Sequence, residues 1–406
     1  MSKIAHVIIA LGNFSIGLLL PLMNLILLDK GASLQTLPLL LAVYSSTVLV
    51  FELPSGIMAD LLGRKVIYLI SSVLKLLSLT LLLLTFHPIW LIFVMFLNGL
   101  SRAFSSGSLD ALFIDQAIAK CGEGILSKVT SALSVLEGIG LALGTVAGGF
   151  LATICGSYSA VITVCLLLNI LLFTLNLLFV KEVRESNKTK RELPSFSRIK
   201  LELRSLSSPK RFSYILAGLF LTGFFLCSVE TYWQPAFQSM SNSTNQSWLY
   251  GMISFFSFAS ITLGNLLIGK LLFRFQNKWW ELFSLTRILF AILILVFALQ
   301  NSKLGFILLY TLVYFSLGTS NVAESSIMNK LIPTNLRSSF LSLGSLVVQI
   351  GALFASILSS ILINYLHITG LWLLSGTLIF LYAVASIYIS ISQSQKQSIN
   401  TLDTTE

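Results

Sequence analysis

Charge is the scarcest property of this chain. Of its 406 residues, 10% are Asp, Glu, Lys or Arg, less than half the roughly 25% of a typical soluble domain. Hydrophobic residues make up 55%, and the mean hydropathy is +0.89. So few charges cannot cover that much apolar surface in water, which excludes a soluble enzyme, a nucleic-acid-binding domain and a disordered scaffold. A membrane protein with several spans is the class that remains.

Side chains suited to metal binding or nucleophilic chemistry are also few. The four cysteines are scattered without a CxxC pair, and the three histidines lie far apart in the sequence. We therefore expect no disulfide framework, no metal site and no cofactor. The sequence contains no GxxxxGK[ST] loop and no HExxH or Ser/His/Asp constellation. These observations argue against ATP hydrolysis and against an intramembrane hydrolase, so the chain is not expected to be an enzyme.

Apolar runs long enough to cross a bilayer follow one another along the chain. The runs are continuous and do not alternate with polar residues, which excludes a β-barrel. The first run is too long for the core of a signal peptide, so we expect it to be retained as a span. The twelve expected spans are 4–28, 35–57, 66–86, 89–113, 129–153, 158–180, 212–237, 248–272, 279–299, 304–328, 339–363 and 368–391.

The basic residues indicate the orientation of these spans. On this layout 21 of the 26 Lys and Arg residues fall on one side, and only Lys30 and Lys303 fall on the other. Cytoplasmic loops are enriched in Lys and Arg, so both termini are expected in the cytoplasm. The net charge of +10 then faces anionic membrane lipids and not nucleic acid. The short loops favour a bacterial cytoplasmic membrane.

A basic segment at 181–211 divides the chain into two halves. It carries ten basic and four acidic residues and is interpreted as a cytoplasmic linker, with a lipid head-group site as the alternative. Residues 1–180 and 212–392 form the expected six-helix halves, and 393–406 form a cytoplasmic tail. The run Asp110–Asp115 aligns with Glu324–Asn329, a faint internal repeat. The sequence thus predicts an all-α membrane protein with twelve transmembrane helices in two pseudo-symmetric halves, an arrangement typical of secondary transporters.

The loop after the second span contains a dense motif. It reads Glu52-Leu-Pro-Ser-Gly56-Ile-Met-Ala-Asp60-Leu-Leu-Gly63-Arg64-Lys65. Gly56 would let another helix approach closely, and Gly63 suits a tight reversal of the chain. Asp60 lies at a helix end, where it can accept hydrogen bonds from the N-terminus of a neighbouring helix.

This loop resembles the GxxxDxxGRK signature of the major facilitator superfamily, and the resemblance extends over nearly the whole chain. The resemblance implies the major facilitator fold and alternating access. It also implies that Gly56, Asp60, Gly63, Arg64 and Lys65 govern switching between inward-open and outward-open states and do not bind the substrate. The alternative is a turn that only sets the topology.

Arg102 lies within the fourth span, where a buried charge is costly and should face a cavity or an acid. Its position resembles the membrane-embedded Arg that is linked to proton coupling in many exporters of the family. Asp110 lies two helical turns further on and is a second candidate for proton coupling. The alternative is a structural pair between an Arg and a carboxylate.

Glycines form a stripe in the fifth span at Gly140, Gly144 and Gly148, which allows close helix packing. The stripe resembles the GxxxGPxxGG motif of family antiporters, except that Thr145 replaces the proline. The resemblance implies export, and simple helix packing is the alternative.

Other polar residues lie inside the spans. Glu137 and Glu230 are candidates for proton exchange, and Glu230 with Tyr232 and Trp233 could bind an amphipathic or cationic substrate. An interfacial aromatic belt is the alternative for that cluster. Lys75 is expected to reach Glu52 or Asp110 in a structural ion pair, and a role in substrate binding is the alternative. Asn13 and Asn98 are expected either to line the cavity or to make hydrogen bonds between helices.

The function predicted on this basis is secondary active transport by alternating access, with proton-coupled export of small amphipathic molecules such as drugs or metabolites. A nutrient importer or uniporter of the same superfamily is the alternative. The expected partners are a small-molecule substrate, protons and membrane lipids, and the chain is expected to act as a monomer.

Overall fold

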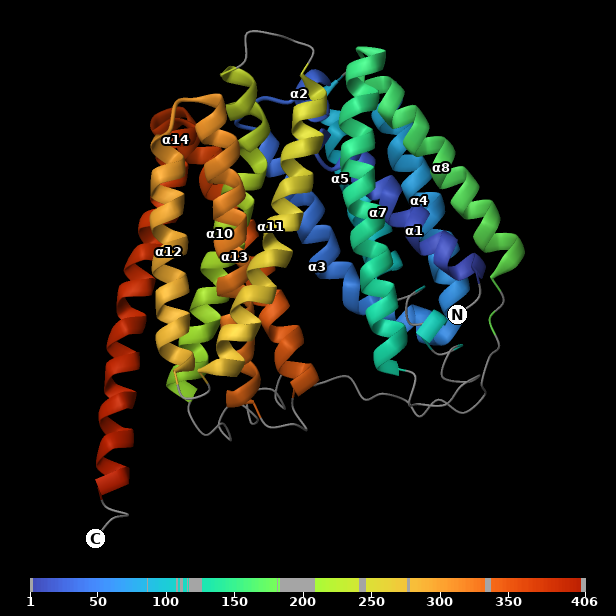
Figure 1. Ribbon diagram of the computed structural model, residues 1–406. Helices are drawn as coiled ribbons and strands as arrows, with labels where there is room; N and C mark the ends of the chain where they lie inside the picture. The colour runs from blue at the N-terminus through green and yellow to red at the C-terminus, as the bar shows by residue number, and fades with distance from the viewer. Residues whose placement is uncertain are drawn as a thin grey trace. The chain divides into compact units, whose positions relative to one another are not determined.

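The fold was analysed in a computed structural model that describes residues 3–85, 87–106, 109, 112–114, 116, 126–180, 182, 209–240, 246–275, 278–332 and 337–402. Within these ranges all regular structure is helical (Figure 1). In chain order the helices are α1 (Lys3–Leu19), α2 (Met23–Asp29), α3 (Leu37–Leu62), α4 (Arg64–Leu84), α5 (Pro88–Ser105), α7 (Leu126–Cys155), α8 (Tyr158–Phe179), α10 (Pro209–Ser239), α11 (Ser247–Arg274), α12 (Trp279–Leu299), α13 (Lys303–Leu331) and α14 (Arg337–Leu402).

Nine helices among the described residues are long and apolar enough to cross a membrane, or ten if α1 and α2 form one broken span. These two helices are bent by 47° at the break. Pro21 lies in the break, and its ring cannot donate the backbone hydrogen bond that a continuous helix needs. The apolar part of α3 is shorter, at Leu37–Glu52. The total of twelve spans therefore stays a prediction.

Helix α14 contains the last two expected spans. Its backbone leaves the helical region at His367, where φ is 54°, between the expected spans 339–363 and 368–391. The helical backbone then continues to Leu402. The expected tail at 393–406 is therefore helical as far as Leu402. The sequence placed its beginning where the apolar pattern ends, and the helix continues beyond that point.

The chain forms two compact units. Unit 1 contains Met1–Lys190 and Thr231–Phe255, and unit 2 contains Arg191–Glu230 and Phe256–Glu406. Unit 1 includes the end of α10 and the beginning of α11, and the halves expected at 1–180 and 212–392 stay a prediction. Asn24 Nδ2 donates to Gln234 Oε1 over 2.6 Å, and Tyr232 Oη donates to the Leu34 carbonyl over 3.1 Å. Such hydrogen bonds between polar side chains and helices hold the segment 231–255 within unit 1.

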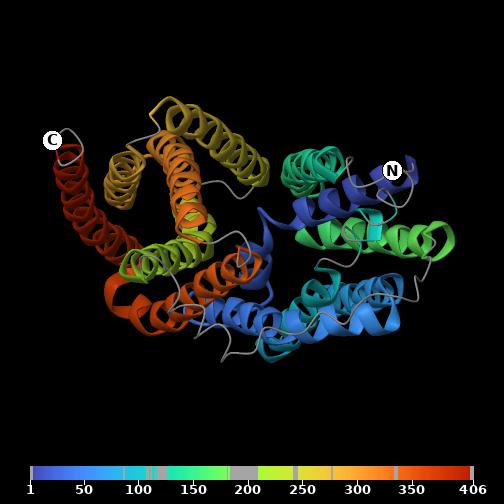
Figure 2. The same cartoon turned by 90° about the horizontal axis from the view of Figure 1, so that it is seen from below.

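Within unit 1, α1 lies between α7 and α8 (Figure 2), while α5 packs against α3 and α4. Ala5, Ile8 and Ile9 of α1 belong to its buried apolar cluster, together with Leu133 of α7 and Leu172 of α8. Within unit 2, α12 packs against α13 and α14. Each unit thus has an apolar core of its own.

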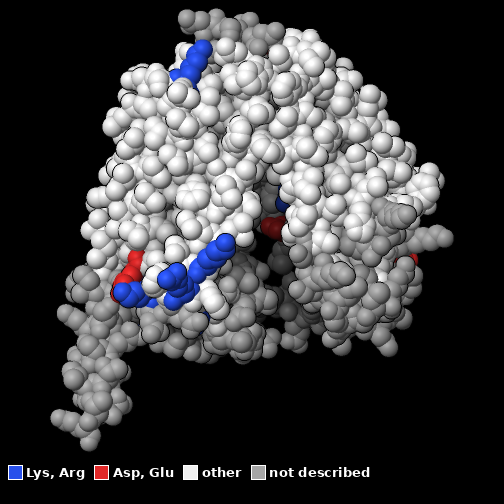
Figure 3. Space-filling model, viewed as in Figure 1, with Lys and Arg blue, Asp and Glu red and all other residues white. Residues whose placement is uncertain are grey.

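The outer surface of the molecule fits a lipid environment. Much of the described surface in Figure 3 carries no charge, and large apolar side chains are exposed, such as Leu263 at 60% and Phe273 at 79%. Lys and Arg side chains gather at the lower ends of α11 and α12 in that view, where the sequence places Lys270, Arg274 and Lys278. Apolar flanks with basic helix ends are typical of an integral membrane protein.

The glycine stripe of α7 packs against α1, as the sequence suggested. A Cβ atom at Gly140, Gly144 or Gly148 would lie closer than 3.0 Å to backbone atoms of α1 at Ala10, Phe14 and Leu18, respectively. At a second contact inside unit 1, a Cβ at Gly149 would lie 2.8 Å from the Ser247 carbonyl at the start of α11. The stripe therefore serves close helix packing.

We expect Gly144→Ala to lower the free energy of unfolding by about 1–3 kcal/mol, because the added methyl group overlaps backbone that cannot move aside as a side chain can. Thermal unfolding of the purified protein in detergent measures this effect. Gly138→Ala is the matched control on the same helix, since a Cβ there meets no described atom within 4 Å. Equal melting temperatures for the two variants would contradict the packing described here.

Candidate functional site

The turn between α3 and α4 has the geometry that the motif predicted. Gly63 has φ +103°, a conformation that favours glycine. The carboxylate of Glu182 accepts hydrogen bonds from the backbone N–H groups of Arg64 over 2.8 Å and Lys65 over 3.0 Å. A Cβ at Gly63 would lie 2.8 Å from Glu182 Oε2. Glycine is thus required here both for its backbone conformation and for the space that Glu182 occupies.

Glu182 was not found by sequence reasoning. It lies two residues after the sixth expected span, and its carboxylate binds the N-terminus of α4, where the helix dipole favours a negative charge. We had expected such an interaction from Asp60, whose side chain lies outside the described part of the chain. A Cβ at Gly56 meets no described atom within 4 Å, so the close approach of another helix there stays a prediction. Lys65 Nζ donates to the Leu177 carbonyl of α8 over 2.9 Å, so the turn contacts α8 as well.

Lys75 of α4 binds a neutral partner in place of the expected acid. Its Nζ donates to Asn98 Oδ1 of α5 over 2.7 Å. Among the described residues it forms no ion pair with Glu52, and Asp110 lies outside the described ranges. Arg102, one turn after Asn98, is exposed and likewise has no carboxylate partner in the parts of the chain that are described. Two cations of the expected spans in unit 1 thus have no carboxylate partner among the described residues.

Unit 2 holds a buried ion pair that sequence reasoning also missed. The guanidinium of Arg287 on α12 donates to a carboxylate oxygen of Glu324 on α13, and the two side chains are 0% and 1% exposed. Arg287 also donates to Thr222 Oγ1 of α10 over 3.0 Å. The pair therefore ties three helices together. Two lone charges in apolar spans, and the alignment of Glu324 with Asp110, were the signals available in the sequence.

Space for this pair comes from Gly218 on α10. A Cβ at that position would collide with Glu324 Oε1 and with the hydroxyl of Tyr382 on α14. Tyr382 stacks on Tyr214 with ring centroids 4.4 Å apart, and its hydroxyl donates to the Tyr214 carbonyl over 3.0 Å. The ion pair is thus enclosed by four helices of unit 2.

Glu230 of α10 lies in a second polar cluster of unit 2. Both Tyr310 and Tyr314 of α13 donate to Glu230 Oε1, Tyr310 over 3.5 Å, and the two hydroxyl groups lie 3.3 Å apart. The sequence had grouped Glu230 with Tyr232 and Trp233. Those two residues belong to unit 1, where they are 0% and 1% exposed, so a shared aromatic site stays a prediction.

The remaining candidates have local roles in what is described. Asn13 Nδ2 donates to the Ile9 carbonyl of its own helix over 3.0 Å, and Glu137 is half-buried on α7.

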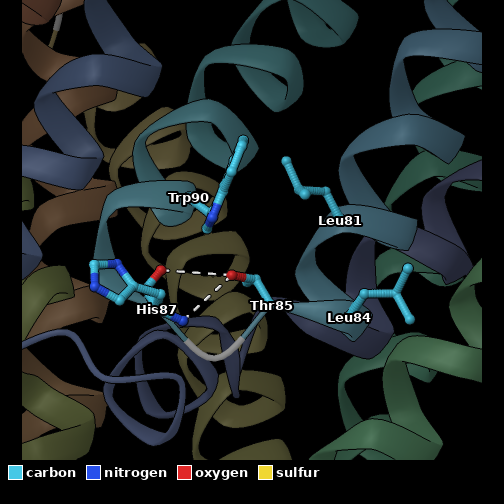
Figure 4. A pocket seen from close by; sticks show the side chains of 5 residues that line it. All are labelled: Leu81, Leu84, Thr85, His87 and Trp90. Atoms are coloured by element: carbon cyan, nitrogen blue, oxygen red, sulfur yellow. Dashed lines mark hydrogen bonds between the residues drawn. The ribbon is translucent and has the colours of Figure 1, made fainter.

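A shallow surface pocket at the α4–α5 connection is lined by Leu81, Leu84, Thr85, His87 and Trp90 (Figure 4). No Asp, Glu, Lys or Arg is among these five lining residues. Among the described residues no group of His, Cys, Asp or Glu could hold a metal ion.

The comparison with known families decides the class. A family model described as Major Facilitator Superfamily matches residues 4–337. The chain belongs to the Major Facilitator Superfamily. Its apolar helices and this family make it a multi-pass integral membrane transporter. Its relatives are likewise transporters and not enzymes, as the sequence led us to expect.

Similar proteins agree with this class. The chain is 24% identical over 364 residues, 87% of either chain, to an uncharacterized MFS-type transporter, YxaM, of Bacillus subtilis (strain 168). It resembles two crystal structures of the nucleoside transporter NupG, one of them of a mutant. Their TM-scores are 0.79 and 0.77, each at 14% identity and covering 95% of this chain and 98% of NupG. At that identity the likeness shows the fold.

Replacing Glu182 should loosen the first turn of α4. We expect Glu182→Ala to lower the free energy of unfolding by about 1–2 kcal/mol, as for the loss of a helix N-cap. Hydrogen–deuterium exchange should become faster at the amides of Arg64 and Lys65. Glu281→Ala is the control, because Glu281 is exposed and its 3.8 Å ion pair with Lys278 contributes little. Unchanged exchange at the two amides would rule out the proposed contact.

Proposed function

We propose that this transporter couples solute movement to protons and exports small amphipathic molecules by alternating access. The observation that carries the proposal is the buried pair of Arg287 and Glu324. An ionisable residue inside a membrane protein is costly and is usually tied to a transport pathway or a proton relay. Glu324 offers a carboxylate that can take up a proton, and Arg287 makes the arrangement of three helices depend on that proton.

The energetics of the pair suit a switch better than a structural support. Burying two charges costs free energy that their attraction only partly returns, and well-packed apolar residues often stabilise a protein as well or better. Stability alone thus gives little reason for the pair. When Glu324 is protonated, its attraction to Arg287 weakens, and the packing of α10, α12 and α13 that the pair favours loses its advantage.

Proton uptake can drive transport only if the two states of the transporter differ in proton affinity. In the state described here Glu324 accepts from Arg287, which favours the ionised carboxylate. A state in which the two side chains separate would favour the protonated acid. Proton binding would then shift the population from the first state to the second. Coupling further requires that the solute also binds one of the two states more tightly than the other.

We assign a gating role to the α3–α4 turn. Glu182 binds this turn and is the second residue of the linker expected at 181–211. A displacement of the linker would therefore act on the N-terminus of α4 through two hydrogen bonds. This assignment agrees with the role that the family resemblance implies for Gly63, Arg64 and Lys65.

Export is proposed because the α7 glycine stripe resembles the antiporter motif. The stripe also packs tightly on α1, so it supports the direction only through that resemblance. Import of a specific nutrient is the opposing possibility. The name of NupG makes nucleosides a sensible part of any test panel.

The test uses inverted membrane vesicles with an imposed proton gradient and a panel of cationic, neutral and anionic compounds that includes nucleosides. We expect some compounds to collapse the gradient with the wild-type protein and none to do so with Glu324→Gln, which cannot release a proton at that position. Glu281→Gln, at an exposed acid of α12, should behave like the wild type.

Glu324→Gln leaves Arg287 buried without a counter-charge, which can cost about 3–5 kcal/mol. The double variant Arg287→Gln and Glu324→Gln removes both charges and keeps the protein testable if the single variant folds poorly. A folded variant without Glu324 that still collapses the gradient as the wild type does would defeat the proposal. Gradient-independent uptake of a panel compound would favour the importer.

A further inference from the structure

The two units treat their intramembrane cations differently. Arg287 of unit 2 has Glu324 as a counter-charge. Lys75 and Arg102 of unit 1 have no carboxylate partner among the described residues, and Lys75 binds only the neutral side chain of Asn98. Because an unpaired charge inside a membrane protein is costly, two of them in one place require an explanation.

Arg102 lies on the inward face of α5. It shares a helical stripe with Leu91, Met95 and Asn98, at spacings of four, three and four residues. Leu91 and Met95 on this stripe are 0% and 2% exposed. The lipid-facing side of the helix carries exposed apolar residues instead, such as Phe93 at 51%. Arg102 is nevertheless exposed, so its guanidinium is accessible on the side of the helix that faces the protein.

Lys75 has the corresponding position on α4. Ser71, Ser78 and Leu82 share its stripe and are all buried. Ser71 Oγ donates to the Ser101 carbonyl over 2.8 Å, and Ser78 Oγ donates to the Val94 carbonyl over 3.0 Å. These hydrogen bonds join α4 to α5 above and below Lys75 and fix the lysine beside Asn98.

The two cations lie close together. Lys75 donates to Asn98 of α5, and Arg102 lies one turn further along the same face of that helix. Helices α4 and α5 thus bring two positive charges and an amide to one region of unit 1. A Cβ at Gly99 on α5 would lie 2.8 Å from the Tyr44 carbonyl, so α3 and α5 are in close contact beside this region.

We propose that Lys75 and Arg102 bind the anionic head group of the transported solute, so that the substrates are amphipathic organic anions. The proposal rests on the proposed transport function and names its substrate class. Glu52 is hydrogen-bonded to Ser106, one turn beyond Arg102, but neither cation has a carboxylate partner of its own among the described residues. An anion would supply that partner, since a guanidinium binds carboxylate, sulfonate and phosphate oxygens in a bidentate manner. A cationic solute, which the Glu230 cluster had suggested, would be repelled here.

The proposal predicts an unusual combination of stability and binding. A structural Arg or Lys stabilises the fold, so its removal lowers the melting temperature. An unpaired cation held for a ligand costs free energy in the absence of that ligand. Arg102→Gln and Lys75→Gln should therefore melt at or above the wild-type temperature without solute, while they lose the response to anions.

The experiment uses the whole chain in detergent with the exposed Cys155 replaced by Ser, and a thiol-reactive dye, which then reports unfolding through the buried Cys165. The probes share one aromatic body: 1-naphthoate, 1-naphthalenesulfonate and 1-naphthyl phosphate as anions, 1-naphthamide as the neutral analogue and 1-naphthylmethylamine as the cation. We expect the anions to raise the melting temperature of the wild type, and the amide and the amine to leave it unchanged. Arg102→Gln and Lys75→Gln should bind the anions at least tenfold more weakly.

Arg274→Gln and Lys270→Gln are the matched controls, because both residues are exposed at the end of α11 and should keep the wild-type response. The proposal is overturned if the amide stabilises the wild type as much as the anions do, or if no anion stabilises it. It is also overturned if Arg102→Gln melts below the wild type without probe, as a pair with Asp110 would require.

Failure of proton coupling would be distinguishable from failure of this site. Binding in detergent needs no gradient, so Glu324→Gln should keep the full response to the anionic probes even though it loses proton-driven flux. Loss of the anion response in Arg102→Gln together with its retention in Glu324→Gln supports the assignment of the two sites to separate units.

Discussion

The high cost of placing a charge inside a bilayer constrains this structure more than any other interaction. It limits the intramembrane Lys and Arg residues to three in the expected layout. One of them, Arg287, is held against Glu324 in unit 2 and joins α10, α12 and α13. The other two, Lys75 and Arg102, lie in unit 1 and have no carboxylate partner among the described residues. A paired charge can be switched by a proton, and an unpaired cation can be neutralised by an anionic solute, which is why we propose proton coupling for the first arrangement and solute binding for the second.

Close backbone packing supports these polar sites. Glycines let α7 approach α1 in unit 1, and Gly218 leaves room for Glu324 and Tyr382 in unit 2. In a membrane, helices associate through such packing and through hydrogen bonds between polar side chains, because lipid is as apolar as the protein core. The hydrogen bonds of Ser71 and Ser78 between α4 and α5 are examples, and they hold Lys75 beside Asn98. Precise placement of a few polar groups thus depends on small residues that carry no chemistry of their own.

Most of the architecture could be predicted from the sequence, because apolar runs report membrane-spanning helices directly. The turn at Gly63 and the packing of the glycine stripe were predicted correctly, since each depends on local geometry. The partners of the charged residues could not be predicted. Among the described residues Lys75 binds Asn98 and forms no ion pair with an acid, and the N-terminus of α4 is bound by Glu182, over a hundred residues away in the chain. Arg287 and Glu324 were visible as lone charges, but their contact depends on how α12 and α13 pack, which no motif specifies. The contact of Asn24 with Gln234 at the end of α10 likewise depends on how the helices pack, which the sequence does not specify.

The central claim is that Glu324 gains and loses a proton during transport. Infrared difference spectroscopy of the protein in lipid membranes measures this directly, because a protonated carboxyl group absorbs apart from a carboxylate. The account predicts a protonated-carboxyl band that appears as the pH falls, shifts when a transported solute is added, and is absent from Glu324→Gln. A solute-dependent band that persists unchanged in Glu324→Gln would contradict it and would assign the proton to another acid.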